Sequence, residues 1–317
     1  MVNLLQLIKT GQRFPYIEKL SFSSDGMLLS NAENCLSIWD VESGKLKRKI
    51  ESKNFLSISP DYKFVAEGIY GFRGLDKVID HIKIRELASW EVIQTITNVG
   101  SATLINFTAD NKYLTVVKGT YIFLYDLKNG SLIKYWESSS HLFDNGGYHS
   151  TIRGVKIREV SITGKGSENS LIAAGGDNKV NIWKIPSGEL HARFKQHDYV
   201  FCKALKFSDD GEYIVSADEG GNYEFKLWRV KDGLCLKTIQ TGMSILSIDI
   251  SSSNKDIVVG GNSSYKSDGK IKVYSFSGEL KHEFGHEFNE IQSIAFSRNS
   301  NHLAAAGRNG DITIWQL

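Results

Sequence analysis

The feature that most constrains this chain is an internal repeat. The segments Phe22-Ser-Ser-Asp-Gly26 and Phe207-Ser-Asp-Asp-Gly211 share one pattern, and each is followed by an alternating run that ends in tryptophan, at Trp39 and Trp228. Residues 296–315 repeat this pattern, and residues 171–183 repeat its second half. Self-similarity at a fixed period predicts a chain that is built from repeated supersecondary units.

One aromatic position recurs in the repeat, and the number of its occurrences gives the number of repeats. Successive marks lie 40 to 58 residues apart, and a period of about 40–45 residues is typical of a β-propeller blade. One copy has the same alternation without the aromatic, in Ile82-Lys-Ile84-Arg85. Seven marks therefore predict seven blades. The six aromatic marks are Trp39, Tyr125, Trp183, Trp228, Tyr274 and Trp315.

Each unit also has the local pattern of β-strands. Residues 19–22 and 293–296 place apolar side chains at every second position, which is the period of a half-buried strand. Asp25-Gly26 and Asp210-Gly211 supply residues that tolerate positive φ in tight hairpins. No segment shows a sustained helical period. The sequence predicts an all-β fold with four-stranded antiparallel blades.

The two ends of the chain are predicted to complete one blade. The last unit stops after its third strand, and the apolar run Leu4–Ile8 precedes the first unit. Pairing of this run beside Ile312–Leu317 would close the ring and protect a sheet edge. We expect a single domain over residues 1–317. Its blades are predicted at residues 17–50, 54–96, 102–137, 157–195, 200–240, 244–284 and 290–317, the last completed by residues 4–9.

These motifs resemble the WD-repeat family over essentially the whole chain. The family's dipeptide stands as Trp39-Asp40 and, in weaker form, as Tyr125-Asp126, while its Gly-His pair stands as Gly285-His286 with Gln196-His197 as a near match. The resemblance implies a seven-bladed propeller that binds other proteins. It also implies that His197 and His286 form hydrogen bonds within their blades. The blade markers are then Trp39, Asp40, Tyr125, Trp183, Trp228, Tyr274, Trp315, His197 and His286.

Composition argues against several other classes of protein. The 38 basic and 36 acidic residues leave a net charge of +2, whereas nucleic-acid binders usually carry a basic excess. The three cysteines are far apart, which excludes a disulfide scaffold and a sequence-local zinc site. No signal peptide and no apolar stretch of about 18 residues is present, so we expect a cytoplasmic protein without a membrane segment.

A search for chemical motifs predicts no catalytic residue. The eight histidines are scattered, and neither a His-Glu-x-x-His motif, a Gly-x-Ser-x-Gly elbow nor a Walker loop occurs. Gly164-Lys-Gly-Ser167 sits between predicted strands, with no helix to supply its dipole to a phosphate. We therefore expect a protein that is not an enzyme and has neither a metal nor a small-molecule cofactor.

Four long connections are predicted to open on one face. Glu67–His81, Asp218–Glu224 and Gly261–Lys270 join second and third strands, and Ser138–Lys156 joins the third and fourth blades. Long loops on a rigid scaffold concentrate binding residues, and aromatic residues and arginine dominate interfaces. The candidate partner-binding residues are Tyr70, Phe72, Arg73, Tyr148, His149, Arg153, Tyr223, Tyr265 and Lys266.

The function predicted from the sequence is a non-catalytic protein–protein interaction scaffold. It could equally be the sensor subunit of a larger complex, binding a peptide or protein on the face with the long loops. One alternative is a propeller enzyme or small-ligand binder that uses the central channel. The other is a nucleic-acid-associated subunit with a local basic patch made of Arg73, Lys77, Arg153, Lys156, Lys266 and Lys270. The fold alone does not separate these classes.

Overall fold

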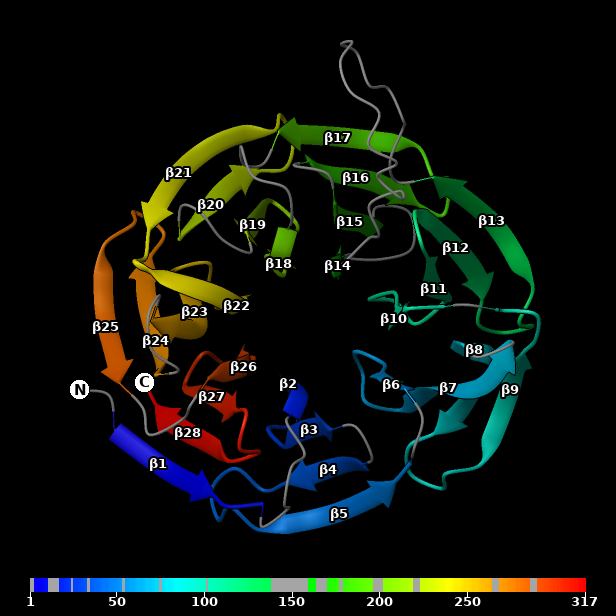
Figure 1. Cartoon of the computed structure of the whole chain (residues 1–317), viewed down its shortest axis with the longest axis horizontal. Coiled ribbons are helices and arrows are strands. Elements are labelled where there is room, and N and C mark those ends of the chain that lie inside the picture. The colour runs from blue at the N-terminus through cyan, green and yellow to red at the C-terminus, as the bar shows by residue number, and fades with distance from the viewer. Residues whose placement is uncertain are drawn as a thin grey trace. The chain divides into compact units, whose positions relative to one another are not determined.

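The computed structural model describes residues 3–10, 17–23, 25–32, 35–52, 55–73, 76–100, 102–137, 159–163, 170–176, 179–195, 202–218, 223–263, 268–285 and 290–317. Across these ranges 28 β-strands form seven four-stranded sheets and no helix occurs (Figure 1). The all-β, seven-bladed propeller predicted from the repeat is confirmed. The chain divides into two compact units, residues 1–56 with 203–317 and residues 57–202, with boundaries inside β6 and at the start of β18.

The first unit contains four blades, each an antiparallel sheet. The first blade is β2 (Ile17–Phe22), β3 (Leu28–Ala32), β4 (Cys35–Trp39) and β5 (Leu46–Glu51). The fifth is β18 (Cys202–Phe207), β19 (Tyr213–Asp218), β20 (Glu224–Arg229) and β21 (Leu234–Gln240). The sixth is β22 (Met243–Ile250), β23 (Asp256–Ser263), β24 (Gly269–Ser275) and β25 (Leu280–Gly285). The seventh is β26 (Ile291–Phe296), β27 (His302–Gly307), β28 (Ile312–Gln316) and β1 (Asn3–Ile8).

The second unit contains the other three blades. The second blade is β6 (Phe55–Ile58), β7 (Phe64–Arg73), β8 (Asp76–Glu86) and β9 (Val92–Ile96). The third is β10 (Leu104–Phe107), β11 (Tyr113–Lys118), β12 (Tyr121–Asp126) and β13 (Leu132–Glu137). The fourth is β14 (Glu159–Thr163), β15 (Ser170–Gly176), β16 (Lys179–Ile185) and β17 (Leu190–Lys195).

The turn between the first and second strands is built by the same local chemistry in several blades. In the fifth blade the Ser208 hydroxyl donates to Asp210 Oδ1 at 2.6 Å and accepts the Tyr213 N–H at 3.0 Å, while Gly211 takes a φ of 72°. These bonds satisfy groups that the end of a strand leaves unpaired. The hydroxyls of Ser59, Thr108 and Ser297 make the same two hydrogen bonds, one donated to the side chain two residues on and one accepted from the N–H five residues on.

A β-bulge stands opposite the repeated marker position. In the first blade Trp39 pairs with Leu46 and Ile38 with Arg48, so Lys47 is an extra residue in the fourth strand. A bulge of this kind bends the strand and increases its twist. The register shifts at the same place in the next five blades, at Arg85, Tyr125, Trp183, Trp228 and Tyr274.

The N-terminal strand β1 is the fourth strand of the seventh blade. Ile8 pairs with Ile312 and Leu4 with Trp315, which confirms the predicted closure. The register shifts again opposite the marker, because Leu5 is the extra residue beside Trp315. β1 therefore reproduces the geometry of the other fourth strands, although it precedes the rest of its blade by about the length of the chain.

The marker side chains are buried, and several of them pack on the preceding blade of the same unit. Trp183 packs with Val117 and Ile122 of the third blade, and Trp315 stacks on Phe284 of the sixth at 5.3 Å between ring centroids. Two of the indoles also donate to a serine of the second strand: Trp39 to Ser30 at 2.8 Å and Trp228 to Ser216 at 2.9 Å. The exposed fraction of Trp39, Tyr125, Trp183, Trp228, Tyr274 and Trp315 does not exceed 8%.

The second blade replaces the tryptophan–serine contact with an ion pair. Arg85 occupies the marker position, and Glu67 occupies the position that Ser30 and Ser216 hold in their blades. Arg85 Nε donates to Glu67 Oε2 at 2.6 Å, and its Nη1 donates to the Trp90 carbonyl at 2.9 Å. The pair is shielded, since the side chains of Glu67 and Arg85 are 7% and 17% exposed. In this blade a charge-assisted hydrogen bond therefore links the third strand to the second, as the indole–serine hydrogen bond does in the first and fifth blades.

Candidate functional site

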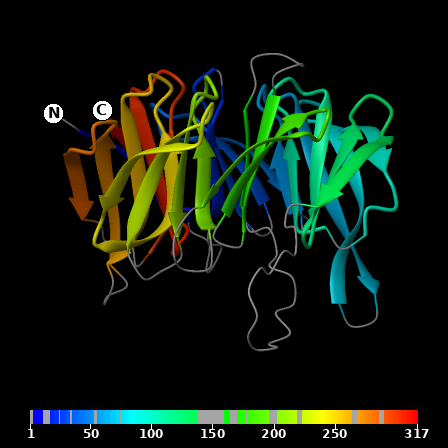
Figure 2. The same ribbon diagram turned by 90° about the horizontal axis from the view of Figure 1, so that it is seen from above.

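The connection predicted as a loop over Glu67–His81 is instead a long β-hairpin. β7 and β8 contain 10 and 11 residues, whereas the other described strands contain 4 to 8. Their pairing continues as far as Arg73 with Asp76. Figure 2 shows this hairpin projecting beyond the other strands of its unit. The loop prediction was wrong because backbone pairing orders the insertion; we call residues 69–79 the β7–β8 arm.

The base of the arm is fastened to the third blade. Ile79 is 2% exposed and forms an isolated bridge with Ala102, and the Val99 N–H donates to the Asp80 carbonyl at 3.3 Å. A Cβ at Gly68 would lie 3.0 Å from the side chains of Ile105 and Ile79. A larger residue there would require these side chains to shift, so glycine favours the close approach. The base of the arm is therefore held in place by the third blade.

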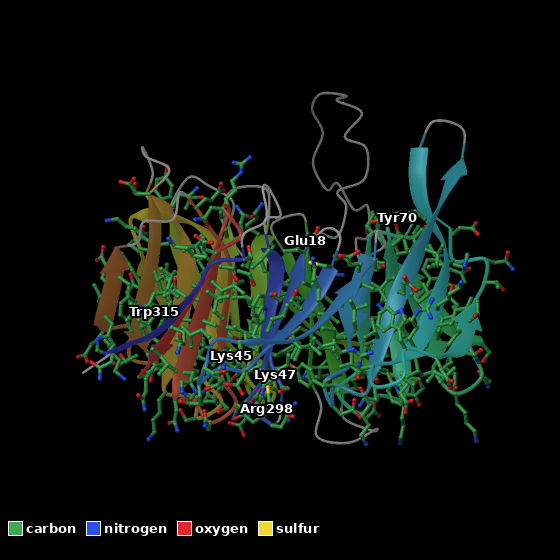
Figure 3. All side chains as sticks on the ribbon, turned by 90° about the horizontal axis from the view of Figure 1, so that it is seen from below. Glu18, Lys45, Lys47, Tyr70, Arg298 and Trp315 are labelled. Atoms are coloured by element: carbon green, nitrogen blue, oxygen red, sulfur yellow. The ribbon has the colours of Figure 1, made fainter. Side chains whose placement is uncertain are left out.

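Tyr70 lies where the arm begins. The register shifts between Ile69 and Tyr70, which leaves Asp80 as the extra residue of β8. Tyr70 is half-buried at the base of the arm (Figure 3). Nearby, His81 Nδ1 lies 3.3 Å from Asp80 Oδ2. A bulge re-aims the side chains around it, so this one sets the direction in which the arm leaves the blade.

Tyr223 lies at the corresponding end of the fifth blade. It has a φ of 53°, which is uncommon for a residue with a side chain. Its carbonyl accepts the Thr241 N–H and the Thr241 hydroxyl, both at 2.7 Å, and Lys272 Nζ donates to the Thr241 carbonyl at 2.7 Å. The backbone of Tyr223 is thereby fixed to the connection that leads into the sixth blade.

In the sixth blade, too, the second and third strands extend further than predicted. Asn262 pairs with Gly269, and the Ser263 N–H donates to the Asp268 carbonyl at 3.2 Å. Lys270, one of the cations of the predicted basic patch, lies 3.3 Å from Glu283. Its charge is therefore partly balanced within the blade. Strand pairing again extends into a segment that the sequence predicted as a connection.

Several predicted site residues lie outside the described residues. Tyr148, His149, Arg153, Tyr265 and Lys266 are among them, as are His197 and His286 and the cation Lys156. Phe72, Arg73 and Lys77 are placed only by the backbone of β7 and β8. The backbone positions of Tyr70, Phe72 and Arg73 thus all lie on the β7–β8 arm. Tyr223 lies in the other unit.

The buried carboxylates in the described part of the chain are engaged in structural contacts. Asp249 accepts the Phe296 N–H at 2.8 Å and lies 2.9 Å from Lys206 Nζ. Glu224 accepts from the Gln240 amide at 2.6 Å. The third buried carboxylate is Glu67 of the ion pair above. All three side chains therefore make contacts between strands or blades.

The shifted pKa values also belong to structural groups. Burial raises the pKa of Tyr274 to about 12, with a contribution from Glu283. Hydrogen bonds from Ser43 lower the pKa of Asp40, and the bond from Arg229 lowers that of Asp232. Over the described ranges no group of three or more His, Cys, Asp or Glu side chains could hold a metal ion. The same ranges contain no helix long and apolar enough to cross a membrane.

Two stretches of the chain match a known family model. The model "WD domain, G-beta repeat" matches residues 188–229 and 278–316. Each stretch begins at a turn before a fourth strand and ends with the third strand of the next blade. The sequence repeat is therefore offset by one strand from the blade, which is the same offset that leaves β1 to complete β26–β28.

Three relatives share limited identity with the chain. Autophagy-related protein 16 of Arabidopsis thaliana is 23% identical over 177 residues, which cover 56% of this chain and 32% of that protein. Cell division cycle 20.1, cofactor of APC complex, of the same plant is 22% identical over 272 residues, covering 77% and 51%. Eukaryotic translation initiation factor 3 subunit I of Lodderomyces elongisporus is 26% identical over 107 residues, covering 34% and 30%.

The matched part of the chain spans about a third to a half of the length of these relatives. Their names describe an autophagy-related protein, a cofactor of a complex and a subunit of an initiation factor. Both family matches fall on strands that the structure assigns to blades of four strands each. From the blades and the repeat together, we conclude that the chain is a WD40-repeat β-propeller with seven blades.

Proposed function

We propose that this protein is a non-catalytic interaction scaffold, or the sensor subunit of a larger complex, which binds a peptide or protein partner through the β7–β8 arm. The observation that carries the proposal is the fixed base of the arm, at Ile79 and Gly68. A projection whose base is fixed before binding loses less conformational entropy there when a partner docks. The relatives named as a complex cofactor and a factor subunit support the same class of function.

The arm places residue types that favour an interface. Tyr70, Phe72 and Arg73 follow one another within a few residues of β7. Aromatic residues and arginine supply most of the binding energy at protein interfaces. The buried carboxylates are occupied by structural contacts, which favours binding over catalysis. The long connection with Tyr148, His149 and Arg153 and the sixth-blade residues Tyr265 and Lys266 are proposed as further contacts on this face.

The test is a change at the arm that leaves the blades intact. A tagged full chain is purified from its native source, with and without nuclease, and the most abundant protein partner is identified by mass spectrometry. We expect Phe72→Ala with Arg73→Ala to weaken that partner at least tenfold, or about 1.4 kcal/mol. The melting temperature should change little, because the arm lies beyond the core of its blade.

The matched control is Lys165→Ala with Glu168→Ala, in a connection between first and second strands and therefore predicted on the opposite face. This pair should leave binding unchanged. If the control abolishes binding while the arm variant retains it, the partner uses the opposite face. If nuclease releases every partner, the protein acts with nucleic acid and the proposal is wrong.

A further inference from the structure

The β7–β8 arm is longer than the strands on either side of it. β7 has 10 residues beside the four of β6, and β8 has 11 beside the five of β9. The pairing of β8 with β9 ends at Ile82 with Ile96, so Asp76–His81 lie beyond it. Among the described strands, the arm is therefore a two-stranded ribbon toward its tip. Such a ribbon is marginally stable in water and gains stability from a third strand.

The edge of β8 that faces away from β7 is already paired at the base of the arm. The connection into the third blade passes along this edge, where Ile79 forms an antiparallel bridge with Ala102 and the Val99 N–H donates to the Asp80 carbonyl at 3.3 Å. Val99 is fully buried there. Both contacts are made by main-chain groups, so this edge of β8 accepts a neighbouring segment through its backbone.

The connection leaves this edge at Thr103. Continuing the antiparallel register of the bridge would place Leu104 opposite Lys77. Instead, the Thr103 N–H donates to the Val117 carbonyl at 2.9 Å, and Leu104 pairs with Val117 in the third blade. In the described part of the chain, β7 is the one strand that pairs with Asp76–Val78. The edge of β8 thus extends toward the tip beyond the segment that covers its base.

This edge selects the conformation of a ligand. In an antiparallel pair, every second residue directs its N–H and C=O groups away from the partner strand, and a row of such groups is a template for one more strand. The N–H groups of a helix are bonded within the helix, and proline has none. An extended segment with available N–H groups is therefore the ligand that matches the edge, and its main-chain hydrogen bonds supply affinity.

We propose that the partner is recognised by strand addition: an extended segment of it pairs with the outer edge of β8 over Asp76–Val78, in line with Val99 and Ala102. This inference rests on the proposed function, which places the partner on the arm, and adds the way in which the partner binds there. The added segment turns the ribbon into a three-stranded sheet. Because Ile79 is already held at the base, less of the arm has to be ordered on binding.

The probe for the experiment is a peptide that depends on the arm. A phage library of random 12-residue peptides is selected on the full chain and counter-selected on a shortened-arm variant, in which Asn-Gly replaces residues 72–77. Gly71 pairs with Val78, two positions from the pair Arg73–Asp76 at the tip. A two-residue turn therefore fits between Gly71 and Val78, and the variant should fold; its melting temperature checks that.

The decisive measurement is made on the wild type. The selected peptide is resynthesised with a fluorescent label and with one N-methyl group at a time on successive main-chain nitrogens, and each Kd is measured by anisotropy. Because alternate N–H groups of an added strand face the arm, we expect N-methylation to weaken binding about tenfold or more at every second position. The positions between should change little. A ligand that is bound through its side chains alone would not show this alternation.

The matched control keeps the main chain of the edge and changes its side chains, as Asp76→Ser with Lys77→Thr. Threonine favours strands, and lysine at a sheet edge discourages pairing with another strand. The Kd of the selected peptide for this variant should therefore stay the same or fall, whereas the shortened-arm variant should bind the peptide about tenfold more weakly or worse.

Four results would overturn the proposal. The first is a selection without a peptide that distinguishes the wild type from the shortened-arm variant. The second is an N-methyl series without alternation. The third is loss of peptide binding in the control variant, which would assign recognition to side chains. The fourth is a wild-type dimer in sedimentation that the shortened-arm variant abolishes, because a second copy of the chain would then occupy the edge.

Failure of strand addition is distinguishable from failure of the proposed function. If Phe72→Ala with Arg73→Ala releases the native partner while the N-methyl series shows no alternation, the arm is the binding site but does not bind by adding a strand. If that variant retains the native partner, the proposed function itself is wrong.

Discussion

At the scale of single residues, the second blade shows how one position can be satisfied by two kinds of chemistry. Trp39 and Trp228 each donate to a serine of the second strand, and Arg85 donates to Glu67 at the equivalent place. Glu67 depends on its partner more than the serines do, because burying a charge without a counterion destabilises the fold. The sequence showed that the aromatic mark was missing; the contact that replaces it became visible only through the pairing of β7 with β8.

This ion pair leads to a prediction about stability. Glu67→Ala leaves the guanidinium of Arg85 without its carboxylate, so the free energy of unfolding should fall by about 3–5 kcal/mol. The double change Glu67→Ser with Arg85→Trp installs the pair found in the first and fifth blades, and should recover most of that loss. Urea unfolding of the three proteins measures both effects.

The exposed pair Lys63–Asp61, whose lysine side chain is 72% exposed, is the control. Lys63→Ala should change the free energy of unfolding by about 1 kcal/mol or less. If Glu67→Ala costs no more than Lys63→Ala, the buried pair does not stabilise the second blade.

At the scale of the blade, the bulge and the marker aromatic act together. The extra residue of the fourth strand stands opposite the marker in all seven blades. A bulge bends its strand and increases the local twist of the sheet, and for Trp183 and Trp315 this happens beside a side chain that packs on the preceding blade. The bulge is therefore a property of the whole repeat and not of one blade.

Removal of a marker tests this packing. We expect Trp183→Ala and Trp315→Ala each to lower the free energy of unfolding by about 3–5 kcal/mol, because each leaves a cavity between two blades. The residues around Trp183 include Ile122 and Val117, and Phe284 faces Trp315. Chemical denaturation gives the values.

Tyr135→Ala is the reference for the marker variants, since the ring of Tyr135 is largely exposed. It should cost far less than either tryptophan. Equal losses for all three substitutions would show that the markers do not hold neighbouring blades together.

At the scale of the whole molecule, the offset between repeat and blade explains the place of the first strand. Both family matches start before a fourth strand and end with a third strand. A chain of such repeats begins with a fourth strand whose blade is completed by the last repeat. β1 and β28 satisfy that requirement through the pairs from Asn3–Gln316 to Ile8–Ile312.

Deletion of residues 1–9 should therefore damage the fold. It removes β1, exposes the edge of β28 and uncovers Trp39, which packs with Ile8 and Ile312. Exposed sheet edges promote aggregation, so we expect a large fall in melting temperature or aggregation seen by sedimentation. A shortened chain that remains monomeric and melts within a few degrees of the full chain would contradict this role for β1.

The sequence by itself determined the features that depend on nearby residues. The turn at Ser208–Asp210–Gly211 is closed by bonds within a few residues, so its pattern, its copies and hence the seven blades are visible in the sequence. The closing strand also follows from the repeat, because an unfinished last unit and an unassigned apolar run at the other end imply each other.

Only the tertiary structure decided the features that depend on pairing between distant residues. The arm was predicted as a long connection between second and third strands, whereas its backbone pairs as far as Arg73 with Asp76. The contact of Arg85 with Glu67 and the stacking of Phe123 on Tyr135 both depend on strand register. A side chain's neighbours across a sheet are set by that register, which is why composition and spacing did not reveal them.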